Sequence, residues 1–182
     1  MSADEDLPVA FLPQDAHGLP GRLGLAPAPG RWRPYSPVEP ERMVADDLAC
    51  LRDRCGAAVL VTLLEEAEMW TIGLGRLLEG ARSAGLESVW FPICDATAPT
   101  DLEQTGRLVG CILEHLSAGR TVVIHCHAGI GRTGTVAACC LVAAGQDPWR
   151  AIDLVREARP GAATAPGQEE FVHEFATARW RK

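Results

Sequence analysis

The chain has 182 residues, of which 47% are hydrophobic and 23% charged, and its formal net charge is −7. This length suits one domain with a sizeable core and hardly two, and the composition is typical of a globular protein. The negative charge argues against nucleic acid or an anionic membrane as the main partner, and no apolar run approaches the ~20 residues of a bilayer span. The acidic start MSADEDLP lacks the basic opening of a signal peptide, and seven cysteines without a regular framework fit a reducing cytoplasm.

The first forty residues are rich in proline and glycine, which prevents long helices. We expect residues 1–17 to form an irregular, partly disordered segment and residues 18–182 to form a single domain. A short strand is predicted near residues 22–25.

From residue 40 onward, the apolar residues follow regular periods. Met43, Val44, Leu48 and Leu51 are spaced as on one face of a helix, and Gly56 is placed to end it. Helices are predicted within residues 40–56, 73–85, 100–118, 134–144, 148–158 and about 166–179. Strands are predicted at residues 57–64, 86–93 and 120–125. Strands that alternate with helices predict an α/β domain with a central, mostly parallel twisted sheet and helices on both faces.

The stretch VVIHCHAGIGRTGTVAACC, residues 122–140, places a glycine-rich bend between a strand and a helix. At the carboxyl end of a central strand, the free N–H groups and the dipole of the following helix favour an anion. Gly129 and Gly131 permit backbone angles that point successive amides into one concavity, and Arg132 offers a fork of donors for two phosphate oxygens. The bend is therefore predicted to bind phosphate, and the same positive field favours a thiolate nucleophile at Cys126.

Two other uses of this bend are less consistent with the residues. His125, Cys126 and His127 are metal-ligand types, but neighbours on an extended chain point to opposite faces and cannot easily share one ion. The phosphate loop of nucleotide hydrolases needs GxxxxGK[ST], and no lysine follows these glycines. We therefore expect neither a metal nor another cofactor.

HCHAGIGRTG resembles the HCxxGxxR[ST] signature of cysteine-dependent protein tyrosine phosphatases, including the dual-specificity ones. WFPICDATAPTD resembles the acid-bearing loop of that family, and VREARPGAATAPGQEEFVHEF resembles its common ending. The whole order, beginning with GLPGRLGLAPAPG, is most similar to the small kinase-associated phosphatase branch, whose relatives are directed at cyclin-dependent kinases. The resemblance covers about residues 18–175 and implies the protein tyrosine phosphatase fold and metal-free hydrolysis through a phosphocysteine.

The catalytic residues implied by this resemblance are Cys126, Arg132, Asp95, Thr133 and Gln168. Cys126 is the expected nucleophile, and Asp95 is expected to protonate the leaving group and later to act as a base. Gln168 is expected to place the hydrolytic water. Thr133 is expected to donate its hydroxyl to the departing thiolate, although bonding at the helix start explains it equally.

The phosphate-binding residues are expected to be His127, Ala128, Gly129, Ile130, Gly131 and Arg132. His125 is expected to order the loop through bonds to the backbone.

Several nearby residues have more ordinary interpretations. Asp101 is a second candidate acid, but it begins a helix and N-capping explains it. The Glu65–Glu66–x–Glu68 cluster is typical of a helix N-terminus, with contact at the rim of the site as the alternative. Cys94, next to Asp95, is a candidate for a reversible disulfide with Cys126.

The expected substrate is a phosphorylated protein or peptide, handled by a cytoplasmic monomer that binds neither nucleic acid nor a membrane. The short chain lacks room for a large insertion that recognises tyrosine, which favours dual specificity. The alternatives are a non-catalytic phosphopeptide-binding module, a sulfur transferase of rhodanese type, and a phosphatase of inositol lipids or RNA. The variable positions of the loop contain no lysine, which such polyanions would favour.

Overall fold

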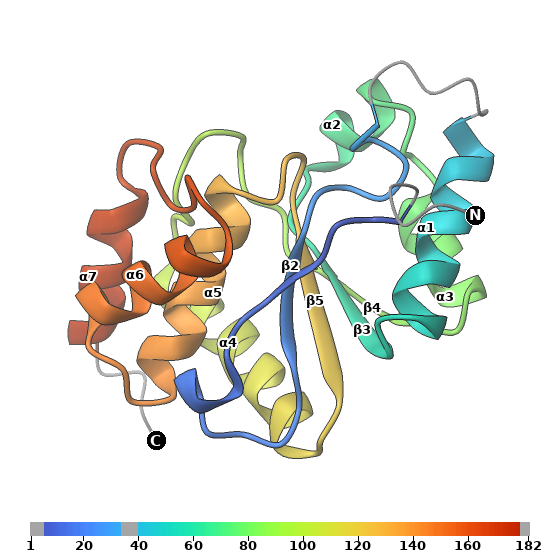
Figure 1. The fold of residues 1–182 in the computed structure, drawn as a ribbon. Helices are drawn as coiled ribbons and strands as arrows, with labels where there is room; N and C mark the ends of the chain where they lie inside the picture. The colour runs from blue at the N-terminus through green and yellow to red at the C-terminus, as the bar shows by residue number, and fades with distance from the viewer. Residues whose placement is uncertain (1–5, 34–39, 179–182) are drawn as a thin grey trace.

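The computed structural model describes residues 6–33 and 40–178, and a five-stranded sheet forms the centre of that part (Figure 1). The strands are β1 (Ala10–Phe11), β2 (Leu23–Ala26), β3 (Ala57–Thr62), β4 (Glu87–Trp90) and β5 (Thr121–His125). Their order is β1-β2-β5-β3-β4; β1 is antiparallel to β2, and the other pairs are parallel. Every residue of β5 is buried, as expected for a central strand that is covered on both faces.

Helices cover both faces of this sheet, which confirms the predicted α/β fold. They are α1 (Pro40–Asp53), α2 (Glu66–Thr71), α3 (Leu77–Ser83), α4 (Leu102–Ser117), α5 (Gly131–Ala143), α6 (Pro148–Ala158) and α7 (Gln168–Thr177). Figure 1 shows α1 and α3 on one face and α4, α5, α6 and α7 on the other.

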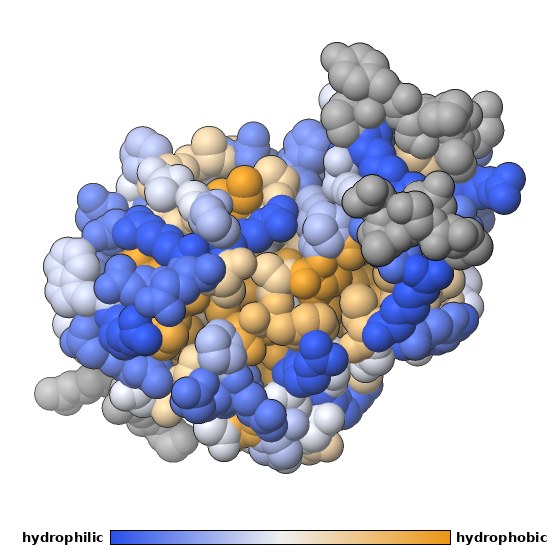
Figure 2. Space-filling view, viewed as in Figure 1, coloured by the Kyte–Doolittle hydropathy of each residue, from blue (hydrophilic) through white to orange (hydrophobic). Residues whose placement is uncertain are grey.

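Helix α5 is buried along almost its whole length because it packs against α4, α6 and α7 as well as the sheet. Its sequence is apolar on all sides, as this position requires. Cys139 and Cys140 are fully buried there, which confirms their predicted place in the core. In the view of Figure 2, apolar surface is gathered in the centre, where the N-terminal segment crosses β2, and charged side chains surround it.

The register of the sheet determines where a site can form. Ala26, His125 and Thr62 lie side by side at the ends of β2, β5 and β3, and Thr62 also pairs with Trp90 at the end of β4. The carboxyl ends of four parallel strands therefore meet at one edge. The segments that follow them, residues 27–33, 63–68, 91–101 and 126–132, all begin there.

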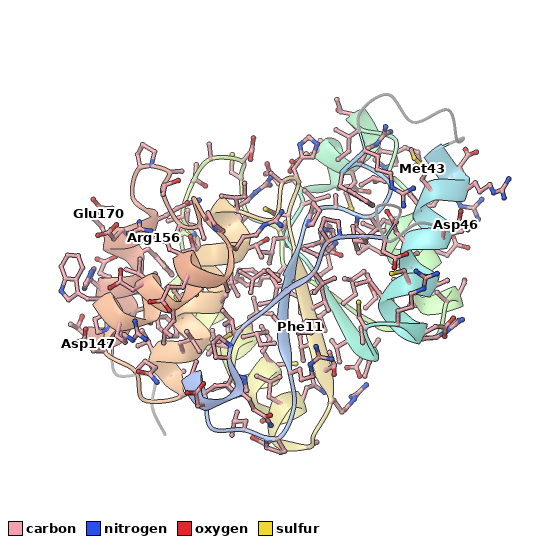
Figure 3. The ribbon with its side chains drawn as sticks, viewed as in Figure 1. Phe11, Met43, Asp46, Asp147, Arg156 and Glu170 are labelled. Carbon is pink, nitrogen blue, oxygen red and sulfur yellow. The ribbon has the colours of Figure 1, made fainter. Side chains whose placement is uncertain are left out.

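Several short elements were not predicted. Residues 6–17, expected to be irregular, contain β1 and a 3₁₀ helix (Gln14–Ala16), and Leu7 and Leu12 are buried in the core. In Figure 3, Phe11 of β1 lies over the sheet, where the Arg22 guanidinium stacks on its ring. The proposed boundary at residue 18 stays a prediction. Residues 1–5, 34–39 and 179–182, on which predictions also fell, lie outside the described residues.

Other element boundaries differ by a few residues. Helix α5 begins at Gly131, three residues before its predicted start, because the last glycine of the bend already has helical geometry. Helix α3 begins only at Leu77, after a turn in which Gly73 has a φ of +72°. Among the described residues, no helix combines the length and apolar character needed to cross a bilayer.

Candidate active site

Residues 126–132, called the phosphate loop below, connect β5 to the N-terminus of α5 at the carboxyl edge of the sheet (Figure 1). Cys126, the first of them, is 3% exposed. Gly129 has a φ of +69°, and a Cβ there would lie 2.3 Å from the Ala26 carbonyl, so only glycine fits against β2. The Ala28 N–H donates to the His127 carbonyl at 2.8 Å, which ties the loop to the segment after β2.

Arg159 holds the outer side of the phosphate loop. It donates to the carbonyls of Ala128 at 2.9 Å and Gly129 at 3.3 Å. Because the N–H and C=O groups of a planar peptide point in opposite directions, carbonyls held outward leave the amides facing inward. Amides that face inward at a helix N-terminus can bind an anion.

His125, the last residue of β5, contacts the phosphate loop and the neighbouring strand β3. Its Nδ1 lies 3.0 Å from the Cys126 carbonyl, and its Nε2 lies 2.8 Å from the Thr62 hydroxyl. Complete burial lowers the pKa of His125 to about 4, so the ring is neutral at pH 7. A neutral ring has one donor, so Nδ1 donates to the carbonyl and Nε2 accepts from Thr62. Both ring nitrogens are occupied, which argues against the metal-binding alternative for this histidine.

Arg132 extends from the first turn of α5 and is 2% exposed. Its Nη1 and Nη2 donate to the two carboxylate oxygens of Glu68, at 2.6 and 2.8 Å, and Nη1 also donates to the Ile93 carbonyl at 3.0 Å. A bidentate pair of this kind fixes the plane of the guanidinium. Glu68, in α2, therefore orients Arg132.

Asp95 reaches the same guanidinium from the acid loop, residues 91–101, which joins β4 to α4. Its Oδ1 lies 2.8 Å from Arg132 Nη2, and its side chain is 71% exposed. The fold therefore brings Asp95 and Arg132, both predicted to act in catalysis, into direct contact.

The charges around Arg132 shift both partners in the expected directions. Burial by itself would lower the pKa of Arg132, but the bonds to Glu68 and the charges of Cys126 and Asp95 together raise it above its ordinary value. The bond from Arg132 lowers the pKa of Glu68. Both groups are therefore ionised at neutral pH.

Gln168, at the start of α7, is fully buried and links the two loops. Its Nε2 donates to the Thr97 carbonyl of the acid loop at 2.9 Å, and its Oε1 accepts from the Ala165 N–H at 3.1 Å. A Cβ on Gly131 would lie 3.0 Å from Gln168 Nε2, so the amide packs directly on the phosphate loop. The predicted water-placing residue thus lies beside both loops.

Thr133 is fully buried, and its hydroxyl has no hydrogen-bond partner among the described residues. A buried hydroxyl without a partner is costly in a resting state and is available to donate during a reaction.

Comparisons with known proteins agree with this geometry. A family model described as "Polymorphic toxin system, DSP-PTPase phosphatase" matches residues 37–146, more than half of the chain. The chain belongs to this family. It is a cysteine-dependent dual-specificity phosphatase with the protein tyrosine phosphatase fold.

Two curated relatives are both described as cyclin-dependent kinase inhibitor 3. Cyclin-dependent kinase inhibitor 3 of Sus scrofa is 28% identical over 178 residues, covering 94% of this chain and 81% of the relative. The human protein of that description is 29% identical over 157 residues, covering 84% of this chain and 71% of the relative. This similarity supports the predicted likeness to the kinase-associated phosphatase branch.

Solved structures show the same fold. Kinase-associated phosphatase with its catalytic cysteine replaced by serine aligns with a TM-score of 0.82 at 24% identity, covering 93% of this chain and 94% of that one. Tk-PTP in its active form aligns with a TM-score of 0.68 at 29% identity, covering 86% of this chain and 92% of that one.

Two other candidate residues of the phosphatase lie in the acid loop. Asp101 caps α4 by accepting from the Gln104 N–H at 2.9 Å, and that bond lowers its pKa. This contact matches the interpretation of Asp101 as an N-cap. Cys94 is exposed and lines a cavity with Phe91 and Gln104, among residues that include none of the phosphate loop. Its disulfide with Cys126 stays a prediction.

Sequence reasoning assigned no catalytic part to Glu68 or Arg159. The acidic cluster at residues 65–68 was interpreted chiefly as a helix N-terminus, with contact at the rim of the site as the alternative. The Glu68–Arg132 ion pair supports that alternative. Arg159 lies in the ending VREARPGA, and no role was predicted for it. Its neighbour Arg156, labelled in Figure 3, bonds the Ala162 and Ala163 carbonyls and Glu169 of α7, so this ending braces α7 against the site.

Proposed function

We propose that the enzyme hydrolyses phosphoprotein monoesters through a phosphocysteine intermediate on Cys126, with Asp95 as general acid and base. One observation carries this proposal: the carboxylate of Asp95 meets Arg132 at 2.8 Å, beside the loop that Cys126 begins. A phosphate-binding loop, a thiol and an exposed acid are thereby gathered at one sheet edge.

The first step transfers phosphate from the substrate oxygen to sulfur. The phosphate dianion binds the inward-facing amides and Arg132, and it replaces the Asp95 carboxylate on Arg132 Nη2. The Asp95 carboxylate, released from Arg132, takes up a proton from solvent. The Cys126 thiolate then forms the S–P bond in line with the breaking P–O bond, and Asp95 gives that proton to the leaving oxygen. Freed from Arg132, Asp95 is placed to reach that oxygen.

The second step hydrolyses the thiophosphate. Gln168 and Asp95 hold a water molecule on the side that the leaving group has vacated, and Asp95 removes a proton as the water oxygen bonds to phosphorus. The S–P bond breaks, and the Thr133 hydroxyl donates to the departing thiolate. Inorganic phosphate leaves and the enzyme is restored.

The expected substrates are phosphoproteins that carry phosphotyrosine, phosphoserine or phosphothreonine. The relatives described as cyclin-dependent kinase inhibitor 3 support a protein substrate, and the loop positions His127 to Gly131 contain no lysine for a polyanionic lipid or RNA. Seven free thiols agree with a reducing cytoplasm as the working compartment.

The test is to trap the intermediate. The enzyme is mixed with a ³²P-labelled phosphopeptide, quenched within milliseconds and digested, and the label is located by peptide mapping. We expect label on the peptide that contains Cys126, a burst of product before steady state, inhibition by vanadate and no loss of activity with EDTA. Label on another residue would contradict the nucleophile, and activity that EDTA removes and zinc restores would contradict the metal-free mechanism.

A further inference from the structure

The segment after β2, residues 27–33, is held rigidly although it contains no helix or strand. Asp47 of α1, only 2% exposed, accepts from the Gly30 N–H at 2.7 Å and from Trp32 Nε1 at 2.9 Å. Arg33 lies 3.7 Å from the other oxygen of Asp47 and stacks over the Trp32 ring. A buried carboxylate that organises an external loop is costly unless it is fully bonded, so it indicates that the shape of this loop matters.

This segment forms one wall of a cavity beside the phosphate loop. The cavity has a volume of about 350 Å³, and its lining includes Pro27, Arg31, Trp32, His127, Ala128 and Arg159. None of the described residues that line it is acidic. It combines basic side chains with an aromatic ring, and it opens next to the residues that follow Cys126.

Two arginines, Arg31 and Arg159, line this cavity, and of these two Arg31 lacks a partner among the described residues. Arg33 is paired with Asp47, and Arg159 bonds the carbonyls of the phosphate loop. Among the described residues, the Arg31 side chain has neither a hydrogen bond nor an ion pair, and its Nε is shielded from solvent without a partner. Gly73 makes room for its guanidinium, because a Cβ there would lie 2.4 Å from Arg31 Nη2. A half-buried guanidinium without a partner favours an anion that enters the cavity.

We propose that this cavity is a second anion subsite, which binds a carboxylate or phosphate on the residue flanking the phosphorylated one. The proposal rests on the proposed function, because it extends the substrate of the same site. Ala128 is two residues from Cys126, so their Cα atoms are at most ~7.6 Å apart, the reach of two residues of an extended peptide. Because Arg31 lines the same cavity as His127 and Ala128, a substrate whose phosphate lies in the phosphate loop can extend a flanking side chain toward Arg31.

The experiment compares matched phosphopeptides. Each pair shares one phosphotyrosine and differs only beside it, with Asp against Asn in one pair and phosphothreonine against threonine in the other. The first pair tests a carboxylate and the second a phosphate. We expect wild-type kcat/KM to favour the anionic member of at least one pair by about tenfold or more, as one charged hydrogen bond provides.

Variants at Arg31 test whether this residue causes the preference for the anionic peptide. Arg31→Gln should abolish it, and Arg31→Lys, which keeps the charge but loses the fork, should retain part of it. The matched control is Arg107→Gln, which removes the same charge from an exposed position on α4 where Arg107 pairs with Glu103. It should leave the preference unchanged. Because the preference is a ratio within each variant, a lower folded fraction does not alter it.

The proposal is overturned if wild type does not distinguish the members of either pair, or if Arg31→Gln keeps the preference. It is also overturned if inositol phosphates are turned over in preference to every peptide. The affinities of the Cys126→Ser variant for the same peptides give the preference for the anionic over the neutral member of each pair without any turnover. They therefore separate a missing subsite from a failure of the proposed chemistry.

Discussion

The phosphate loop and the acid loop begin at the same edge of the sheet but are built in opposite ways. The phosphate loop is fastened at Ala28, at His125 and at Arg159, and its Cys126 is 3% exposed. The acid loop carries Asp95 with 71% of its side chain exposed, and the described contacts between this loop and the phosphate-loop side are made through Arg132 and Gln168. Ala96, next to Asp95, has a φ of +55°, which non-glycine residues rarely adopt.

This difference follows from the two tasks. An anion is bound best by dipoles that are already oriented, because their reorganisation would cost free energy at each turnover. An acid that serves the leaving group and then water must change its position during the cycle. We therefore expect changes in the phosphate loop to affect every substrate, and changes in the acid loop to affect substrates according to their leaving group.

The largest effect is expected for Cys126→Ser. Serine is scarcely ionised at neutral pH, so turnover should fall to background, while the amides and Arg132 remain to bind phosphate. Steady-state assays with an aryl phosphate and calorimetric titration with vanadate or a phosphopeptide measure the two properties. Residual turnover near the wild-type rate would exclude Cys126 as the nucleophile.

Asp95→Asn tests the acid loop. It should lower kcat by ~10²–10⁴ for a phosphopeptide, whose leaving oxygen needs a proton, and much less for p-nitrophenyl phosphate. The matched control is Asp101→Asn in the same loop, which keeps an N-cap acceptor for the Gln104 N–H and should leave kcat near the wild-type value. An equal loss on both substrates would mean that Asp95 is not the general acid.

Glu68→Gln tests how Arg132 is positioned. Without the bidentate carboxylate the guanidinium plane is less fixed, and kcat/KM should fall by ~10–100-fold on good and poor leaving groups alike. Glu66→Gln, at an exposed position of the same helix α2, is the control and should retain wild-type activity. If both variants behave like wild type, Glu68 does not orient Arg132.

Gln168→Ala should have a smaller effect, because it concerns mainly the second step. Loss of the amide should slow hydrolysis of the phosphocysteine by about tenfold or less, while the initial burst keeps its rate. Rapid-quench kinetics separate the two phases. A slower burst with an unchanged steady state would place Gln168 in the first step instead.

The parts of this structure that were predictable are those encoded in short stretches of sequence. The strand, bend and helix around Cys126 lie within twenty residues, and each follows from local geometry: an apolar run, glycines, then a helix. Helix α6 was predicted at its observed bounds, and Pro148 suits its first turn. The structure adds Asp147 as its N-cap. The N-cap role of Asp101 likewise needs only its own neighbours.

The parts that were not predictable depend on contacts between distant residues or on very short elements. Glu68 and Arg132 are 64 residues apart, and Arg159 and Ala128 are 31 apart, so no spacing in the sequence reveals either pair. Strand β1 has two residues and helix α2 has six, too few to show a period of alternation or a helical face. Such elements are stabilised by packing against the sheet rather than by their own sequence pattern.

The smallest expected effect is a pH dependence of the Glu68–Arg132 pair, measured as the difference in Tm between wild type and Glu68→Gln. Bonding to Arg132 lowers the pKa of Glu68 below its ordinary value of 4.5. Its stabilisation is therefore fully present above pH 4.5 and is lost as the pH falls through the lower pKa of the folded state. The difference in Tm should amount to a few degrees at neutral pH and shrink only below pH 4.5.

Other acid-sensitive groups do not obscure this measurement. Burial lowers the pKa of His125 to about 4, so its protonation destabilises the fold as the pH falls below its ordinary value of 6.5. Burial, the largest cause, acts in both wild type and Glu68→Gln, and the charge of Glu68 is the smallest of the causes that shift the pKa of His125, so most of this loss is common to the two proteins. A difference in Tm that already declines between pH 7 and pH 5 would assign the effect to another group, and a constant difference down to pH ~2 would mean that the ionised pair adds no stability.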